Sequence, residues 1–92
     1  MQTYTDRLMK YLEKLDIERV ECCNQIFYWQ NELKDAKEML NLIDENSPIA
    51  FAQKRRVLTA KNFISTFKSH VEQIDIEQAE LETQLNILSS EM

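Results

Sequence analysis

The chain has 92 residues and a formal net charge of −5, with no glycine and a single proline. This length accommodates one domain, and without glycine there is neither a phosphate-cradling loop nor a dinucleotide fingerprint. The negative charge argues against general nucleic-acid binding, which needs a basic surface. We therefore expect a protein without enzymatic activity, cofactor or metal, and with neither membrane nor direct nucleic-acid contacts.

A first long helix is predicted over residues from about 3 to about 44. Its apolar side chains recur at alternating steps of three and four, which is the spacing of a coiled-coil seam. Apart from a threonine and an arginine, all seam positions are apolar or cysteine, and they comprise Thr5, Leu8, Leu12, Leu15, Arg19, Cys22, Ile26, Trp29, Leu33, Ala36, Leu40 and Ile43.

A turn is predicted at residues 45–47, beside the only proline and at a break in the heptad phase. Proline disfavours helical geometry in the preceding residue, so Ser47 should cap a second helix that begins at Pro48. Asn46 is a residue that can adopt the left-handed conformation that often ends a helix. A short polar connection of this kind favours an antiparallel hairpin over one kinked rod.

The second helix is predicted from residue 48 to about residue 90. It repeats the three–four spacing of the first helix, so the two helices are expected to pack along their seams. Its seam positions are Ala50, Gln53, Val57, Ala60, Ile64, Phe67, Val71, Ile74, Gln78, Leu81, Leu85, Leu88 and Met92.

Folding the hairpin about its turn sets which residues meet across the seam. It places Trp29 beside Ile64, and it brings Arg19 to Ile74 and near Gln78. A polar pair of this kind inside a seam can fix the register of two helices. The predicted fold class is all-α: an antiparallel two-helix coiled-coil hairpin that forms a single domain over residues 1–92.

A second set of apolar residues lies off the two seams. Two helices bury only one seam each, which gives a marginal core, and exposed apolar sets usually mark interfaces. We therefore expect the hairpin to dimerise into a homodimeric four-helix bundle with two-fold symmetry. The predicted protein-interface residues are Ile17, Val20, Phe27, Tyr28, Phe51, Leu58 and Phe63.

One edge of the second helix carries charges at steps of seven: Lys54, Lys61, Lys68, Asp75 and Glu82. A second copy lying antiparallel about Lys68 would match Lys61 with Asp75, and Lys54 with Glu82. This pattern independently predicts a two-fold axis near the middle of the rod.

Acidic residues of both helices gather at the end of the hairpin away from the turn. Residues 49–71 hold five basic and no acidic residues, whereas residues 72–92 hold six acidic and no basic residues. The predicted charged interaction face comprises Glu13, Asp16, Glu18, Glu21, Glu72, Asp75, Glu77, Glu80 and Glu82. The run Lys54, Arg55 and Arg56 near the turn is interpreted as a solvated helix face.

The side chains most suited to metal binding are Cys22, Cys23 and His70. Neither CxxC nor HxxxH spacing is present, so we interpret Cys22 as a core thiol and His70 as a flank residue. Two cysteines, no signal-peptide pattern and no membrane span fit a reducing compartment. The expected location is the cytoplasm.

Three functions follow from these features. In the first, the acidic rod mimics a nucleic-acid duplex and inhibits a nucleic-acid-binding enzyme, through contacts that weaken with salt. In the second, the apolar strips grip a partner helix, as in an assembly scaffold, an adaptor or a secretion chaperone. In the third, the dimer binds RNA through a basic face, and only residues 54–68 offer such a face. The acidic inhibitor is the leading hypothesis, and the assembly protein is the alternative.

Overall fold

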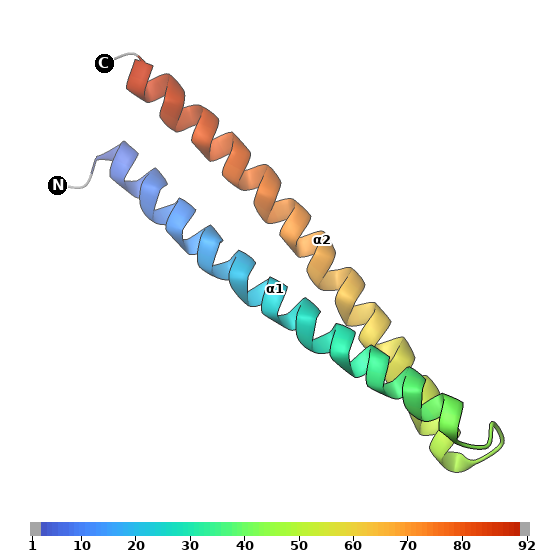
Figure 1. Ribbon diagram of the computed structural model, residues 1–92. Coiled ribbons are helices and arrows are strands. Elements are labelled where there is room, and N and C mark those ends of the chain that lie inside the picture. The colour runs from blue at the N-terminus through green and yellow to red at the C-terminus, as the bar shows by residue number, and fades with distance from the viewer. Residues whose placement is uncertain (1–2, 91–92) are drawn as a thin grey trace.

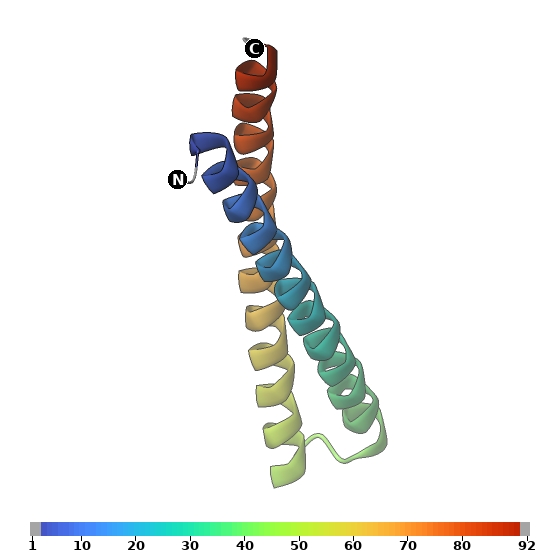
Figure 2. The same cartoon turned by 90° about the vertical axis from the view of Figure 1, so that its left-hand side faces the viewer.

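The computed structural model describes residues 3–90 and shows an antiparallel hairpin of two helices (Figure 1). Helix α1 spans Tyr4–Leu42 and helix α2 spans Pro48–Ser90. The predicted all-α helical hairpin is confirmed. Its principal dimensions are 68 × 20 × 13 Å, so the rod has two broad faces and two narrow edges. Figures 1 and 2 together show the two helices wrapping around each other, with the termini at one end and the turn at the other.

Helix α1 begins with a capped first turn and ends slightly before the predicted boundary. The Oγ1 atom of Thr3 accepts a hydrogen bond from the backbone N–H of Asp6 at 3.1 Å, which satisfies one of the orphan donors of a helix N-terminus. At the other end, Ile43 is extended, with φ −118° and ψ 160°. The helix therefore ends at Leu42 rather than near residue 44.

The turn is held by hydrogen bonds that centre on Asp44 and Ser47. The backbone carbonyl of Asp44 accepts hydrogen bonds from the Ser47 N–H at 3.1 Å and from the Ser47 hydroxyl at 2.8 Å. The Asp44 carboxylate accepts a hydrogen bond from the N–H of Asn46 at 3.2 Å. Ser47 Oγ in turn accepts from the N–H of Ala50 at 3.2 Å, so Ser47 caps α2 as predicted. Asn46 does not adopt the left-handed conformation, because no residue within 3–90 has a positive φ.

The seam follows the predicted three–four spacing along the whole hairpin. Every predicted seam position among residues 3–90 is buried or half-buried, and Met92 lies outside the described residues. Packing that keeps a strict heptad over this length is the signature of a coiled coil. The buried seam residues are Leu8, Leu15, Cys22, Ala36, Ala50, Ala60 and Ile74.

The densest part of the core lies in the middle of the rod and toward the termini. Leu15, Cys22 and Ile74 pack together, with Phe67 and Val71 among the half-buried residues against them. Ile74 is only 2% exposed, and burying such a side chain contributes roughly 1.5–3 kcal/mol. No polar or charged residue within 3–90 is buried, so the buried part of the seam is entirely apolar.

Arg19 and Gln78, which were predicted to lie near each other in the seam, each bond to a carboxylate of the opposite helix. Arg19 Nε donates to Asp75 Oδ1 at 2.8 Å, and Gln78 Nε2 donates to Asp16 Oδ1 at 2.6 Å. Both carboxylates lie at the flank of the seam, and a charged acceptor forms a stronger hydrogen bond than a neutral one. Within residues 3–90, neither helix has a stretch that is long and apolar enough to cross a bilayer.

Candidate interaction faces

The two pairs at the flank of the seam identify the first of the two broad faces. Asp16 of α1 and Asp75 of α2 both contact the partner helix on this side of the seam. Cys23 lies there as well, since Arg19 Nη1 donates to its Sγ at 3.9 Å. Residues at alternating steps of three and four from Asp16 and from Asp75 share this side of their helices. We call this surface the bipolar face.

The bipolar face is defined by two rows of residues, one on each helix. The α1 row is Asp6, Met9, Glu13, Asp16, Val20, Cys23, Phe27, Gln30, Lys34 and Lys37. The α2 row is Phe51, Lys54, Leu58, Lys61, Ser65, Lys68, Glu72, Asp75, Ala79 and Glu82. All of these side chains are exposed, so the whole face is accessible on the isolated hairpin.

Charge on the bipolar face changes sign along the rod. The half nearer the turn carries lysines on both helices, namely Lys34, Lys37, Lys54 and Lys61. The half nearer the termini carries carboxylates on both helices, namely Asp6, Glu13, Asp16, Glu72, Asp75 and Glu82. Lys68 lies near the boundary. One face of the molecule is thus basic at one end and acidic at the other.

Large apolar side chains are also exposed on the bipolar face. The exposed fractions are 60% for Val20, 66% for Phe27, 70% for Phe51 and 62% for Leu58. Lys54 Nζ lies 5.8 Å from the centre of the Phe51 ring, within reach of a weak cation–π contact. Four of the seven predicted interface residues therefore share one face.

The opposite broad face, which we call the Trp29 face, is built around an aromatic stack. The Trp29 and Phe63 rings stack with centroids 4.5 Å apart and planes 10° apart, and Tyr28 meets Trp29 edge-on at 5.0 Å. The structure therefore places Tyr28 and Phe63 on a different face from Val20 and Phe27. Ile17 is exposed on the outer side of α1, one residue beyond Asp16.

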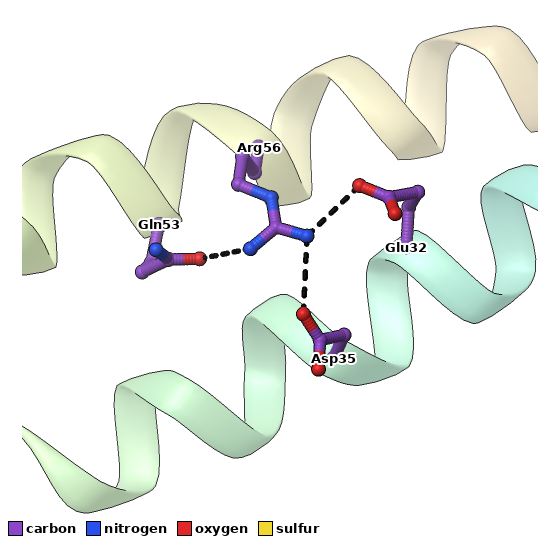
Figure 3. Close-up of polar contacts among 4 residues, drawn as sticks. All are labelled: Glu32, Asp35, Gln53 and Arg56. Atoms are coloured by element: carbon purple, nitrogen blue, oxygen red, sulfur yellow. Dashed lines mark hydrogen bonds and ion pairs between the residues drawn. The ribbon is translucent and has the colours of Figure 1, made fainter.

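An ion-pair network next to this stack joins the two helices near the turn (Figure 3). Arg56 Nη2 donates to Glu32 Oε2 at 2.8 Å and to Asp35 Oδ2 at 3.2 Å, while Nη1 donates to Gln53 Oε1 at 2.7 Å. The hydrogen bonds to Glu32, followed by those to Asp35, raise the pKa of Arg56. This arginine, which we interpreted from the sequence as solvated, instead bridges α1 and α2.

A hollow of about 370 Å³ lies between the aromatic stack and the Arg56 network. Its lining residues are Trp29, Glu32, Ala52, Arg55, Arg56 and Thr59. The indole Nε1 of Trp29 is buried and has no hydrogen-bond partner within the described part of the chain. A buried donor without an acceptor is costly, so this indole is held by ring stacking and not by polar contacts.

The nine predicted acidic residues lie at the end away from the turn, but the structure divides them between the two faces. Glu13, Asp16, Glu72, Asp75 and Glu82 belong to the bipolar face. Glu18, Glu21, Glu77 and Glu80 belong to the Trp29 face by the same helical spacing. They form a band around the rod and not a single acidic face.

Internal contacts occupy part of this acidic band. Asp16 and Asp75 accept from Gln78 and Arg19, as described above. On the Trp29 face, the Tyr11 hydroxyl donates to Glu77 Oε2 at 3.3 Å. The negative charge of Glu77 raises the pKa of Tyr11, which keeps the phenol protonated. Three of the nine carboxylates therefore also take part in joining α1 to α2.

Cys22, Cys23 and His70 are separated by the fold. Cys22 is buried in the core, and this burial raises the pKa of its thiol. Cys23 is exposed on the bipolar face, whereas His70 lines a hollow of about 470 Å³ with Cys22 and Phe67. Within residues 3–90, no three His, Cys, Asp or Glu side chains lie close enough together to hold a metal ion.

Sequence reasoning missed the Arg56 network, the Trp29 stack and the two-face division of the interface residues. The signal was present in the heptad: Glu32, Arg56 and Phe63 all flank the seam on the same side, where antiparallel helices contact each other. Assigning each exposed residue to one flank of the seam would have separated the two faces.

The chain matches no family model, no curated protein and no solved structure.

Proposed function

We propose that the chain is a non-enzymatic protein-interaction module that completes a helical bundle by docking its bipolar face on a second helical surface. The first such surface is another copy of the chain, in a homodimeric four-helix bundle. The observation that supports this proposal is the exposure of Val20, Phe27, Phe51 and Leu58 on one accessible face. Four large exposed apolar side chains on a small protein with a small hydrophobic core are typical of an interface.

Charge placement supports an assembly role over charge mimicry. The carboxylates at the far end are divided between two faces, and three of them contact residues of the opposite helix. The apolar residues of the bipolar face are not consumed in this way. We therefore rank an assembly scaffold, adaptor or chaperone-like module above the acidic inhibitor.

Sedimentation equilibrium of the native chain tests this proposal. The expected mass is twice the monomer mass of 11.0 kDa at high concentration, and it should fall toward the monomer on dilution. Apolar contacts persist in salt, whereas exposed charge contacts are screened, so the dimer should weaken but remain at high salt. A fully helical monomer at every concentration would contradict the proposed dimer.

The acidic inhibitor remains a second candidate because the band of nine carboxylates surrounds one end of the rod. Six of these carboxylates make no hydrogen bond to another side chain within residues 3–90. This hypothesis predicts inhibition of a DNA-binding enzyme at low salt, competed by duplex DNA and lost at high salt. Testing a panel of nucleases at low salt would exclude it if none is inhibited.

A further inference from the structure

The bipolar face is complementary to itself when one rod is reversed. Its lysine half lies toward the turn and its carboxylate half toward the termini, on both helices. A two-fold axis lying in the interface and perpendicular to the rod places α1 antiparallel to α1 of the second copy, and α2 antiparallel to α2. Each lysine half then covers a carboxylate half, a match that favours one orientation.

We infer that the second copy docks on the bipolar face in this antiparallel arrangement, with the two-fold axis passing at the level of Cys23 and Lys68. This inference rests on the proposed dimer and adds the orientation of the second copy and the register of the contact. Two independent patterns, one on each helix, give the same level for the axis.

The first pattern is on α1. Val20 and Phe27 have their midpoint between Cys23 and Asn24, so reversal about this point places Val20 against Phe27 of the second copy. The same reversal places Glu13 against Lys34 of the second copy. The centre of the interface is then apolar and its rim carries opposite charges, which is the usual anatomy of a specific interface.

The second pattern is on α2. Reversal about Lys68 pairs Lys61 with Asp75 of the second copy and Lys54 with Glu82. The two Lys68 side chains approach each other at the axis, and Glu72, one turn along the same face, offers each of them a carboxylate of the other copy.

The two centres lie at the same height because the hairpin register places them there. Trp29 stacks on Phe63 at 4.5 Å. Six residues back from Trp29 is Cys23, and six residues forward from Phe63 is Ser69, the neighbour of Lys68. One axis therefore serves both helix pairs, although the α1 centre comes mainly from apolar residues and the α2 centre from charges.

The size of the bipolar face is sufficient for a stable dimer. The broad side of the hairpin measures 68 by 20 Å between Cα extremes. A standard specific interface buries about 800 Å² on each partner, which is less than this side offers. The apolar residues also lie on both helices, so the contact extends across the width of the rod.

Cys23 provides a direct test because the axis brings the two Cys23 side chains together. Cys23 is the exposed thiol, whereas Cys22 is buried. A short bismaleimide adds to one thiol at each end and needs no oxidant. The native chain treated with bismaleimidoethane at neutral pH should form a covalent dimer, and Cys23→Ser should abolish it.

A matched control moves the thiol to the other face at the same height. Gln25 is exposed and lies at the level of Cys23 but on the Trp29 side, beside His70. The variant with Cys23→Ser and Gln25→Cys should form no covalent dimer at the same protein concentration. All three proteins should sediment as dimers with unchanged helicity, since both substituted positions are exposed.

The outcomes separate this inference from the proposed function. Rapid cross-linking through Cys23 and none through the Gln25→Cys thiol supports the axis. A sedimenting dimer that cross-links only through the Gln25→Cys thiol, or through neither thiol, overturns this register but leaves the dimer. A monomer at every concentration overturns both.

Discussion

The two broad faces of the hairpin differ in the pairing of their basic residues and in the exposure of their aromatic residues. On the Trp29 face, Arg56 is bonded to Glu32 and Asp35, and Trp29 stacks on Phe63. On the bipolar face, the lysines form no ion pair within residues 3–90, and Phe27 and Phe51 are exposed. Both faces therefore carry contacts between the two helices, since Asp16 and Asp75 bond to the opposite helix on the bipolar face. The bipolar face differs in leaving its lysines unpaired within residues 3–90 and its large apolar side chains exposed.

We therefore propose that association depends on the bipolar face, whereas the Trp29 face contributes to the stability of the hairpin alone. Substitutions on the Trp29 face should act on unfolding, and those on the bipolar face should act on dimer dissociation. A substitution on the Trp29 face that changes only dimer dissociation, or one on the bipolar face that changes only unfolding, would contradict this assignment.

The largest expected effect is that of Trp29→Ala. Removing the ring deletes the stack on Phe63 and leaves a gap between the helices, which should lower the free energy of unfolding by about 3 kcal/mol. Urea unfolding followed by circular dichroism, at a concentration where the chain is monomeric, measures this change. The control Phe51→Ala removes an aromatic ring that is 70% exposed, and a change within about 0.5 kcal/mol is expected. Equal losses would mean that the two faces are not distinct.

Phe27→Asp should act on association and not on folding. It places a charge at the centre of the proposed interface, in both copies, so the dimer dissociation constant should rise at least about 30-fold. Sedimentation equilibrium measures the constant, and circular dichroism should show unchanged helicity. Ile17→Asp is the matched control, because Ile17 is similarly exposed, at 61%, but points away from both faces. If Ile17→Asp weakens the dimer as strongly, the interface lies on the outer side of α1.

Arg56→Met should give the smallest effect, and its comparison with Lys54→Met sharpens the contrast. Arg56 bridges the helices through exposed and half-exposed ion pairs, which contribute little to stability in water. We expect a small fall in Tm that disappears at high salt. Lys54→Met should leave Tm of the dilute monomer unchanged and should weaken the dimer instead. An unchanged dimer together with a lowered Tm for Lys54→Met would assign Lys54 to the hairpin.

The sequence was sufficient to predict the seam and most of the turn. Alternating steps of three and four identified Leu15, Cys22 and Ile74 as core, because burial along a coiled coil depends on spacing alone. Ser47 and Pro48 were predicted correctly because capping is local. The end of α1 was not, because the Asp44 carbonyl accepts the Ser47 N–H, and an extended Ile43 makes a left-handed Asn46 unnecessary.

The interaction faces were predicted less completely because they depend on which flank of the seam each residue occupies. Phe27 and Tyr28 are neighbours in sequence, but about 100° of helical rotation separates them and places them on opposite faces. Arg19 was expected to meet Ile74 and to lie near Gln78, but its bond to Asp75 was not predicted. Such choices among flank partners follow from three-dimensional distances that spacing alone does not set.

The most direct test of the central claim is a mixing experiment with Glu13→Lys and Lys34→Glu. In the proposed dimer each Glu13 faces Lys34 of the other copy, so either variant alone places like charges together and should form a weaker dimer than the native chain. When the two variants are mixed, both contacts become opposite-charge pairs. Native mass spectrometry should then show the mixed dimer as the dominant species. Variants that dimerise as strongly as the native chain, or that mix without preference, would contradict an antiparallel dimer on the bipolar face.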